Sequence, residues 1–286
     1  MEVISVGSSS SGNAYIITTQ NNTIILDVGL PARRIIEALH QIGRSPEDVE
    51  AVLITHEHTD HVKSIRAIGR QCPNASFYAS RGTVENAANF KYIDEDRRVI
   101  VRAFDTITLQ SESSNVEVCV FPLSHDAAEP VGFAVSADGE KLAVVTDCGE
   151  MTEEIYEAVS DSDILVLEAN HDENMLMYGD YPYSLKVRIK SEYGHMSNDC
   201  AGDALVRILN DRCREEIDTA HDSERKRPLR IMLAHLSFHN NAPYFARQAV
   251  DEALEKGGFV NGRDYTMDIA AKDEITLLSK GYDTNE

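Results

Sequence analysis

Basic side chains are scarce in this chain, which has 27 lysines and arginines against 48 aspartates and glutamates and a formal charge of −21. Proteins that hold nucleic acid or an anionic membrane mainly by charge need a basic face. The composition therefore argues against both classes. It leaves a metal-centred nuclease open, because two divalent cations add about four positive charges that the net charge does not count.

Paired cysteines and long apolar runs are also missing. The five cysteines are scattered and form no C-x-x-C pair, which argues against a disulfide framework and against a sulfur-ligated zinc site. No apolar run approaches the ~20 residues that cross a bilayer. The segment Met1–Val6 lacks the basic region and the apolar stretch of a signal peptide. We therefore expect a cytoplasmic protein without a membrane partner.

The chain has the composition of a globular protein, with 42% hydrophobic and 26% charged residues. Short apolar segments typical of strands alternate with amphipathic segments typical of helices, which predicts an α/β fold. No repeat and no linker is visible, so we expect a single domain over residues 1–286. Within it, residues 211–230 are polar and of mixed charge, which predicts a helix extension or a solvated insertion.

The segment Thr55–His61 places three histidines and two acidic residues directly after an apolar run. Imidazole nitrogens combined with carboxylate oxygens suit borderline divalent metals. In an extended segment, residues i and i+2 point the same way, so His56 and His58 can share one ion. If the chain then turns into a helix, Asp60 and His61 face a second position. A polar loop with coincidental histidines explains this density of ligands poorly.

Polar residues follow other predicted strands in the same way. In α/β proteins, sites assemble where strands release their carboxyl ends into loops. Any single histidine in such a place is usually a surface or hydrogen-bonded residue, but their number predicts one shared rim. The residues at these strand ends are Asp27, His56, His125, Asp147, Asn170, His171 and His235.

A serine-rich segment, Gly7–Asn13, lies between the first two predicted strands. It is either a flexible surface loop or a cradle whose hydroxyl and amide groups hold a phosphate. On the second interpretation, Ser10, Ser11 and Asn13 contact the substrate.

The run His56-Glu57-His58-Thr59-Asp60-His61 resembles the H-x-H-x-D-H signature of metallo-β-lactamase-fold hydrolases, and His125, Asp147 and His235 follow in that superfamily's order. The resemblance spans nearly the whole chain and implies a four-layer αββα sandwich. It also implies one metal on His56, His58 and His125, and a second on Asp60, His61 and His235. Asp147 would bridge the two, and Asp27 would orient a ligand imidazole from behind.

Segments away from these ligands resemble the YycJ/WalJ (VicX) branch of the superfamily. They are Gly7–Asn13, Leu167–Asp172, Tyr181–Lys186, Gly194–Asn198 and Ala234–Ser237. That branch implies a cytoplasmic bacterial 5′-to-3′ DNA exonuclease. The polar segment 211–230 and Cys148, beside the bridging aspartate, depart from what the branch leads us to expect.

The resemblance implies a dinuclear hydrolase in which two divalent ions, zinc, manganese or iron, share a hydroxide that attacks a phosphodiester. The expected catalytic residues are Asp60, His171 and His195. Expected substrate contacts, besides the serine-rich segment, are Asn170, Ser197, Asn198 and Ser237. Helix capping and loop hydrogen bonds are the structural alternative for these residues.

Two further features favour a nucleic-acid substrate less strongly. Lys186, Arg188 and Lys190 alternate, so they line one face toward a DNA strand or form a solvated edge. Tyr181 and Tyr183 stack on bases or belong to the core. The rival functions are a small-molecule hydrolase on the same fold (a glyoxalase II-type thioesterase, a lactonase or a cyclic-phosphate diesterase) and a regulatory protein that keeps metals without turnover.

Overall fold

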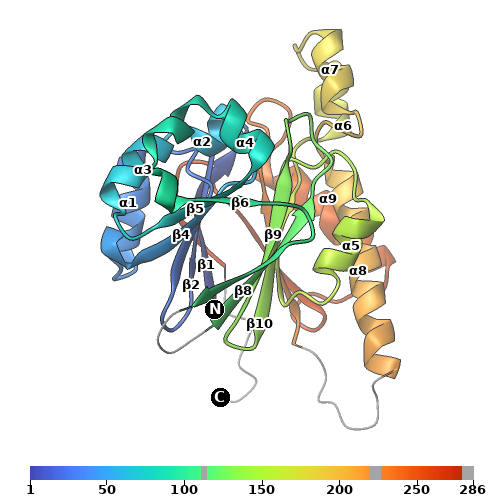
Figure 1. Cartoon of the computed structure of the whole chain (residues 1–286). Helices are drawn as coiled ribbons and strands as arrows, with labels where there is room; N and C mark the ends of the chain where they lie inside the picture. Colours follow the sequence, from blue (N-terminus) through green and yellow to red (C-terminus); the bar gives the residue numbers. More distant parts are fainter. Residues whose placement is uncertain (111–114, 219–226, 279–286) are drawn as a thin grey trace.

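Two seven-stranded sheets packed face to face form the centre of the molecule (Figure 1). The computed structural model describes residues 1–110, 115–218 and 227–278. The first sheet has the order β14-β1-β2-β3-β4-β5-β6 and the second the order β13-β12-β11-β10-β9-β8-β7. Apolar side chains of the two inner faces, such as Leu26 and Phe133, interlock in a buried core between the sheets.

The first sheet contains most of the N-terminal half of the chain. Its strands are β1 (Glu2–Ser9), β2 (Gly12–Thr18), β3 (Thr23–Leu26), β4 (Val49–Leu53), β5 (Ser76–Ser80), β6 (Arg98–Val101) and β14 (Thr276–Leu277). Strands β3 to β6 are parallel to one another. Strands β3 and β4 are mostly apolar because both faces of the sheet are covered there.

The second sheet contains the later strands. They are β7 (Thr106–Gln110), β8 (Asn115–Pro122), β9 (Val131–Ala137), β10 (Glu140–Val145), β11 (Ile164–Glu168), β12 (Leu229–Ala234) and β13 (Tyr265–Ile269). Strands β10 to β13 are parallel, and β8 runs the same way because β9 is antiparallel to both of its neighbours.

Helices cover the two outer faces, which confirms the predicted four-layer αββα architecture (Figure 1). The first sheet is covered by α1 (Ala32–Gln41), α2 (Thr59–Val62), α3 (Ile65–Gln71) and α4 (Arg81–Asn86). The second is covered by α5 (Glu153–Val159), α8 (Asn198–Asp218) and α9 (Pro243–Lys256). Helix α1 buries Ile35, Ala38 and Leu39, whose spacing of three and four residues places them on one face.

Helix α8 continues to Asp218 and so includes residues 211–218 of the polar segment. Residues 219–226 of that segment lie outside the described residues. Within the described ranges, no helix is long and apolar enough to span a bilayer.

The carboxyl ends of the strands that precede the candidate residues lie at one edge of the sandwich. At three of these ends the chain takes a left-handed backbone at a residue other than glycine: φ is 58° at Asp27, 58° at Asp147 and 56° at His235. Such conformations cost free energy and cluster at functional sites. The three corners turn their side chains toward the space between the sheets' ends.

The close packing of this edge also requires a glycine. A Cβ on Gly29 would lie 1.5 Å from the carbonyl oxygen of Asp60. Two main-chain hydrogen bonds, Val28 N–H to His61 O and Ser64 N–H to Val28 O, fix the metal-motif loop on the end of β3. The first strand end and the histidine motif are therefore held as one unit.

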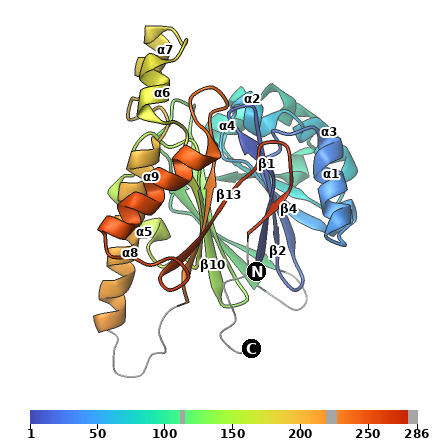
Figure 2. The same cartoon turned by 180° about the vertical axis from the view of Figure 1, so that it is seen from behind.

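A helical arm that the sequence did not predict rises from the same edge (Figures 1 and 2). It comprises α6 (Glu173–Tyr178) and α7 (Tyr183–Ile189). Lys186 and Arg188 lie on α7 and Lys190 directly follows it, so the first of the two interpretations, one face shared by all three, was wrong. Alternation places side chains on one face of a strand but not of a helix.

The interpretation of Gly7–Asn13 as a flexible loop was also wrong. Strand β1 continues to Ser9 and β2 starts at Gly12, so the segment is a tight hairpin. Only Ser10 and Ser11 at its tip are exposed.

Candidate metal centre

Three imidazoles form a first ligand group, consisting of His56, His58 and His125. The first two follow β4 and the third follows β8. Their potential ligand atoms lie within 4.8 Å of one another, and Nε2 of His125 is 3.2 Å from Nδ1 of His58. The group thus offers three imidazole nitrogens and no carboxylate.

Two imidazoles and two carboxylates form a second ligand group, consisting of Asp60, His61, Asp147 and His235. Nε2 of His61 is 3.0 Å from Oδ2 of Asp147 and 3.5 Å from Oδ2 of Asp60. Nε2 of His235 lies 3.6 Å from the same Asp60 oxygen. This group is anionic when its imidazoles are neutral.

Asp147 faces both groups. Its Oδ1 is 3.4 Å from Nε2 of His235 in the second group and 3.7 Å from Nε2 of His125 in the first. Its other oxygen contacts His61. The carboxylate therefore lies between the two ligand groups and contacts histidines of both.

His61 is fixed by a buried carboxylate behind it. Its Nδ1 is 2.7 Å from Oδ2 of Asp27, which also accepts hydrogen bonds from the Thr55 hydroxyl at 2.9 Å. Burial lowers the pKa of His61, but Asp147 and Asp27 outweigh burial and raise it well above its ordinary value. Because Nδ1 is engaged with Asp27, Nε2 is the atom directed into the ligand group.

His235 is fixed in the same way by Glu168, which is not among the expected site residues. Oε1 of Glu168 is 2.7 Å from Nδ1 of His235 and 2.9 Å from Nδ1 of His195. Its other oxygen accepts the main-chain N–H of Cys148 and of Met196. Burial raises the pKa of Glu168, but His195 and His235 outweigh it and lower the pKa to about 2. The only sequence signal was its place at the end of β11.

The first group is electrostatically different. Nδ1 of His56 faces the Thr55 hydroxyl at 3.0 Å, and Nδ1 of His125 faces the carbonyl oxygen of Gly194 at 3.1 Å. Burial, together with the neighbouring imidazoles, lowers the pKa of both histidines. Both rings are therefore neutral, the form that binds a metal.

The donor set fits divalent metal ions. Nε2 of His56 is buried and, among the described residues, forms no hydrogen bond. A buried polar atom without a partner costs free energy, and a metal–ligand bond removes that cost. Mixed imidazole and carboxylate ligands suit zinc, manganese or iron. The second group also suffers strong repulsion unless a cation or protons compensate its carboxylates.

The serine-rich hairpin reaches this centre. Nδ2 of Asn13 lies 3.2 Å from Nε2 of His61. The Ser8 hydroxyl accepts the main-chain N–H of His235 at 2.9 Å, and Ser10 Oγ accepts from Nδ2 of Asn170 at 3.3 Å. Ser11 contacts Ser9 within the turn. Asn13 is thus the hairpin side chain that enters the ligand groups.

The other expected substrate residues are occupied by structural hydrogen bonds. The Ser197 hydroxyl accepts the N–H of Cys200 at the start of α8, and the Ser237 hydroxyl accepts the N–H of Asn240. Asn198 forms a reciprocal amide pair with Asn241, at 3.0 and 2.8 Å. These bonds shape the loops around the centre.

His171 and Cys148 lie beside the centre but outside its ligand groups. Burial lowers the pKa of His171 to about 4, so its ring is neutral. Burial raises the pKa of the Cys148 thiol to about 12, and its Sγ faces the carbonyl oxygen of Glu150 at 3.1 Å. Cys148 is packed among apolar side chains of the second sheet, where it acts as a small core residue.

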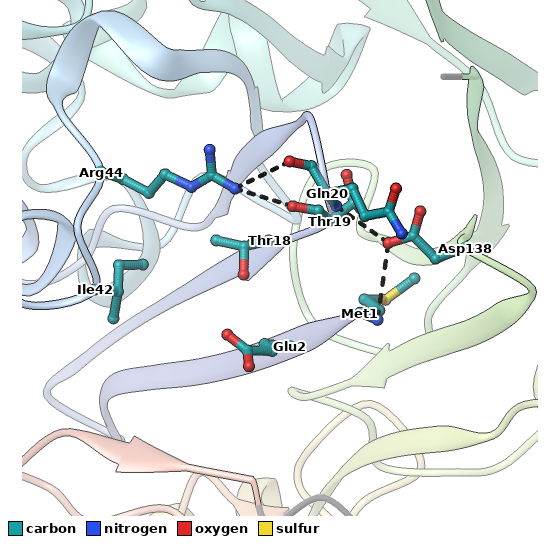
Figure 3. A pocket seen from close by; sticks show the side chains of 8 residues that line it. All are labelled: Met1, Glu2, Thr18, Thr19, Gln20, Ile42, Arg44 and Asp138. Atoms are coloured by element: carbon teal, nitrogen blue, oxygen red, sulfur yellow. Dashed lines mark hydrogen bonds and ion pairs between the residues drawn. The ribbon is translucent and has the colours of Figure 1, made fainter. Parts of the chain in front are cut away.

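A cavity of about 310 Å³ lies at the opposite edge of the sandwich (Figure 3). It is lined by Met1 and Glu2 at the start of β1, by Thr18, Thr19, Gln20, Ile42 and Arg44, and by Asp138. Arg44 donates a hydrogen bond to the main-chain oxygen of Thr19 at 3.0 Å. The cavity contains none of the ligand-group residues and is separate from the chemistry.

Comparison with known proteins finds matches that cover most of the chain. A family profile described as "Beta-lactamase superfamily domain" matches residues 23–213. The chain is 30% identical over 278 residues to the protein named exodeoxyribonuclease WalJ of Streptococcus pneumoniae, with 96% of each chain covered. It is 32% identical over 263 residues to the protein named exodeoxyribonuclease YycJ of Bacillus anthracis, with 92% of each covered.

A solved structure supports the fold independently. The structure of Zn²⁺-bound PqqB from Methylobacterium extorquens aligns with a TM-score of 0.67 at 16% identity, over 96% of this chain and 99% of that one. At this identity the likeness concerns the fold alone.

Proposed function

Because this chain belongs to the β-lactamase superfamily, and within it to the family of the two exodeoxyribonucleases above, we propose that it is a metal-dependent hydrolase that removes nucleotides from DNA ends. We further propose that residues 1–286 form a single metallo-β-lactamase-fold domain and that hydrolysis runs in the 5′-to-3′ direction expected from the YycJ/WalJ branch.

One observation supports the proposal more than any other: two ligand groups meet at one carboxylate, Asp147. A pair of sites sharing a ligand is the arrangement that phosphodiester-cleaving enzymes use for two metal ions. Divalent ions held there would lower the pKa of a bound water molecule and offset the negative charge of the phosphate. We assign one ion to His56, His58 and His125, and the other to Asp60, His61 and His235.

Asn13 is suited to hold a phosphate oxygen. Its Oδ1 accepts the main-chain N–H of Ser9 at 3.1 Å and the Ser8 hydroxyl at 2.8 Å. Its Nδ2 donates to Ser9 O at 3.0 Å. These bonds fix which end of the amide is which, so an N–H rather than a carbonyl faces the ligand groups. Such a preorganised donor stabilises the negative charge that develops on the phosphate.

His195 is suited to protonate the leaving oxygen. Burial lowers the pKa of His195, but Glu168 outweighs burial and raises it above the ordinary value. The Nδ1–Glu168 bond leaves Nε2 as the atom that carries a transferable proton. His171, which burial keeps neutral, is suited to accept a hydrogen bond from the substrate.

The test incubates the purified protein and a His58→Ala variant with Mn²⁺ and DNA labelled at its 5′ or 3′ end. We expect stepwise release of nucleotides from the 5′ end by the protein and none by the variant, which should remain folded. A chromogenic phosphodiester and a thioester are assayed in parallel. Hydrolysis of the thioester, combined with no hydrolysis of DNA, would instead identify a small-molecule hydrolase on this fold.

A further inference from the structure

Three aromatic side chains form a continuous row beside the candidate metal centre. The Tyr181 ring lies 5.8 Å from the His239 ring, and the His239 ring lies 5.2 Å from the Phe238 ring, at 84° to it. The ammonium group of Lys272 lies 4.2 Å above the Phe238 ring. We call Tyr181, His239 and Phe238 the aromatic row. Phe238 is 70% exposed, although burial would stabilise such a ring more than water contact does.

Main-chain hydrogen bonds fix the loop that carries two residues of the aromatic row to segments of the metal centre. Phe238 and His239 belong to the loop that starts at the ligand His235. Ser237 N–H donates to Asn170 O at 2.8 Å, and Asp172 N–H donates to Asn240 O at 2.9 Å, which ties this loop to the end of β11 and to the root of the arm. Because the loop is fixed in this way, the exposed Phe238 ring has a defined position at the surface.

Tyr181 lies in the arm, between the end of α6 at Tyr178 and the start of α7 at Tyr183. The arm is inserted between two segments of the centre, because Glu168 precedes it and His195 follows it. A β-bridge between His171 and Ser197 closes its root. Nε of Arg188 contacts a carboxylate oxygen of Asp126, the residue after the ligand His125. The arm is thereby held against the centre.

The basic residues of the arm are occupied within the protein. Lys186 Nζ donates to the main-chain oxygens of Met177 and Gly179, and Lys190 Nζ pairs with Glu173 at 2.9 Å. With a net charge of −21, the chain has little positive surface with which to hold a DNA strand. Base stacking on aromatic rings needs no such charge, because every base presents a π face.

We propose that the aromatic row binds unpaired bases of a single DNA strand that continues from the phosphate at the metal centre. The inference rests on the proposed function for the identity of the ligand. It adds that the substrate is read as a single strand, by stacking, on the His235 side of the centre. Lys272, above the end of the row, is placed to meet a backbone phosphate of that strand.

The test measures binding of a fluorescein-labelled, phosphorothioate-linked single-stranded dT 12-mer to the Mn²⁺-loaded protein by fluorescence anisotropy. Phe238→Ala and Tyr181→Leu should each weaken binding by about ten-fold, the usual effect of removing one stacking ring. Phe238→Tyr should restore it, since the ring is retained. Tyr92→Ala is the matched control, because Tyr92 is a partly exposed ring with the Arg66 guanidinium 4.2 Å above it, next to α3 on the other outer layer. It should stay within about two-fold.

Hydrolysis gives a second readout. The ratio of 12-mer hydrolysis to hydrolysis of bis(4-nitrophenyl) phosphate, which is too short to reach the row, should fall by about ten-fold in Phe238→Ala. Unchanged 12-mer binding in that variant, or an equal loss with blunt duplex DNA, would overturn the proposal. If the protein binds the 12-mer in a Phe238-dependent way but cleaves no DNA, the aromatic row stands and the nuclease assignment fails.

Discussion

The two ligand groups of the centre use the same residue types in opposite electrostatic settings. In the first, His56 faces a hydroxyl and His125 faces a carbonyl oxygen, and both rings have lowered pKa values. In the second, Asp27 and Glu168 stand behind His61 and His235, and both rings have raised pKa values. His56 and His125 are therefore ready to bind a metal at neutral pH, whereas His61 and His235 must release protons first.

The largest effect is expected at Asp147, the carboxylate that both groups share. Asp147→Ala should empty both metal positions and lower the rate of DNA hydrolysis by about four orders of magnitude. His58→Ala should also abolish hydrolysis but retain the ion of the second group. Metal analysis after gel filtration tells the two apart. Equal metal contents in the two variants would show that the groups do not load separately.

A smaller effect is expected from the carboxylates behind the second group. Asp27→Asn and Glu168→Gln keep the shape of each side chain but remove its charge, and each should weaken metal binding there by about 10–100-fold. Asparagine also tolerates the left-handed backbone at position 27. Titration with Mn²⁺ in competition with a chelator measures both affinities. If metal binding by the first group weakened as much, the electrostatic difference between the two groups would be refuted.

The smallest effect concerns the stability of the metal-free protein against pH. The raised pKa of His235, about 10 against 6.5 in the unfolded chain, adds stability below pH 6.5 that is lost as the pH rises toward 10. The lowered pKa of His56 and His125 acts in the opposite sense, because stability present above 6.5 is lost as the pH falls.

The metal-free protein should thus be most stable near pH 6.5, with the midpoint of thermal unfolding falling by several degrees toward pH 9. Bound metal takes the place of those protons, so the difference in midpoint between Mn²⁺-loaded and metal-free protein should widen over that range. Thermal melts with Mn²⁺ or with EDTA at pH 6, 7.5 and 9 measure it. A constant difference would argue against raised pKa values in the second group.

Much of the fold could be predicted from local pattern. The apolar run Thr23–Leu26 follows the turn residues Gln20–Asn22, a pattern typical of a short strand, and it forms β3 with those bounds. Helices α6 and α7 were missed since each is under two turns long and carries a mixed face, so no periodic apolar stripe distinguishes it from a loop.

The metal ligands could be predicted because they follow strands in a known order. The residues that hydrogen-bond those ligands could not, because only the tertiary fold brings them together. Glu168 was missed because a glutamate at the end of an apolar strand has many ordinary explanations. Its role depends on His195 and His235, which lie 27 and 67 residues later in the chain. The same limit applies to the aromatic row, since the contact between Tyr181 and His239 leaves no trace in sequence spacing.

Asp27, Asp147 and His235 have positive φ angles, so the residue type that best suits the backbone at these positions differs from the residue type that the site needs. Glycine and asparagine adopt this backbone conformation at the lowest cost in free energy, whereas a histidine there destabilises the folded protein. A library of variants selected only for solubility would therefore drift away from the residues found here. The strained backbone at these three positions is therefore explained by the activity of the site and not by the stability of the fold.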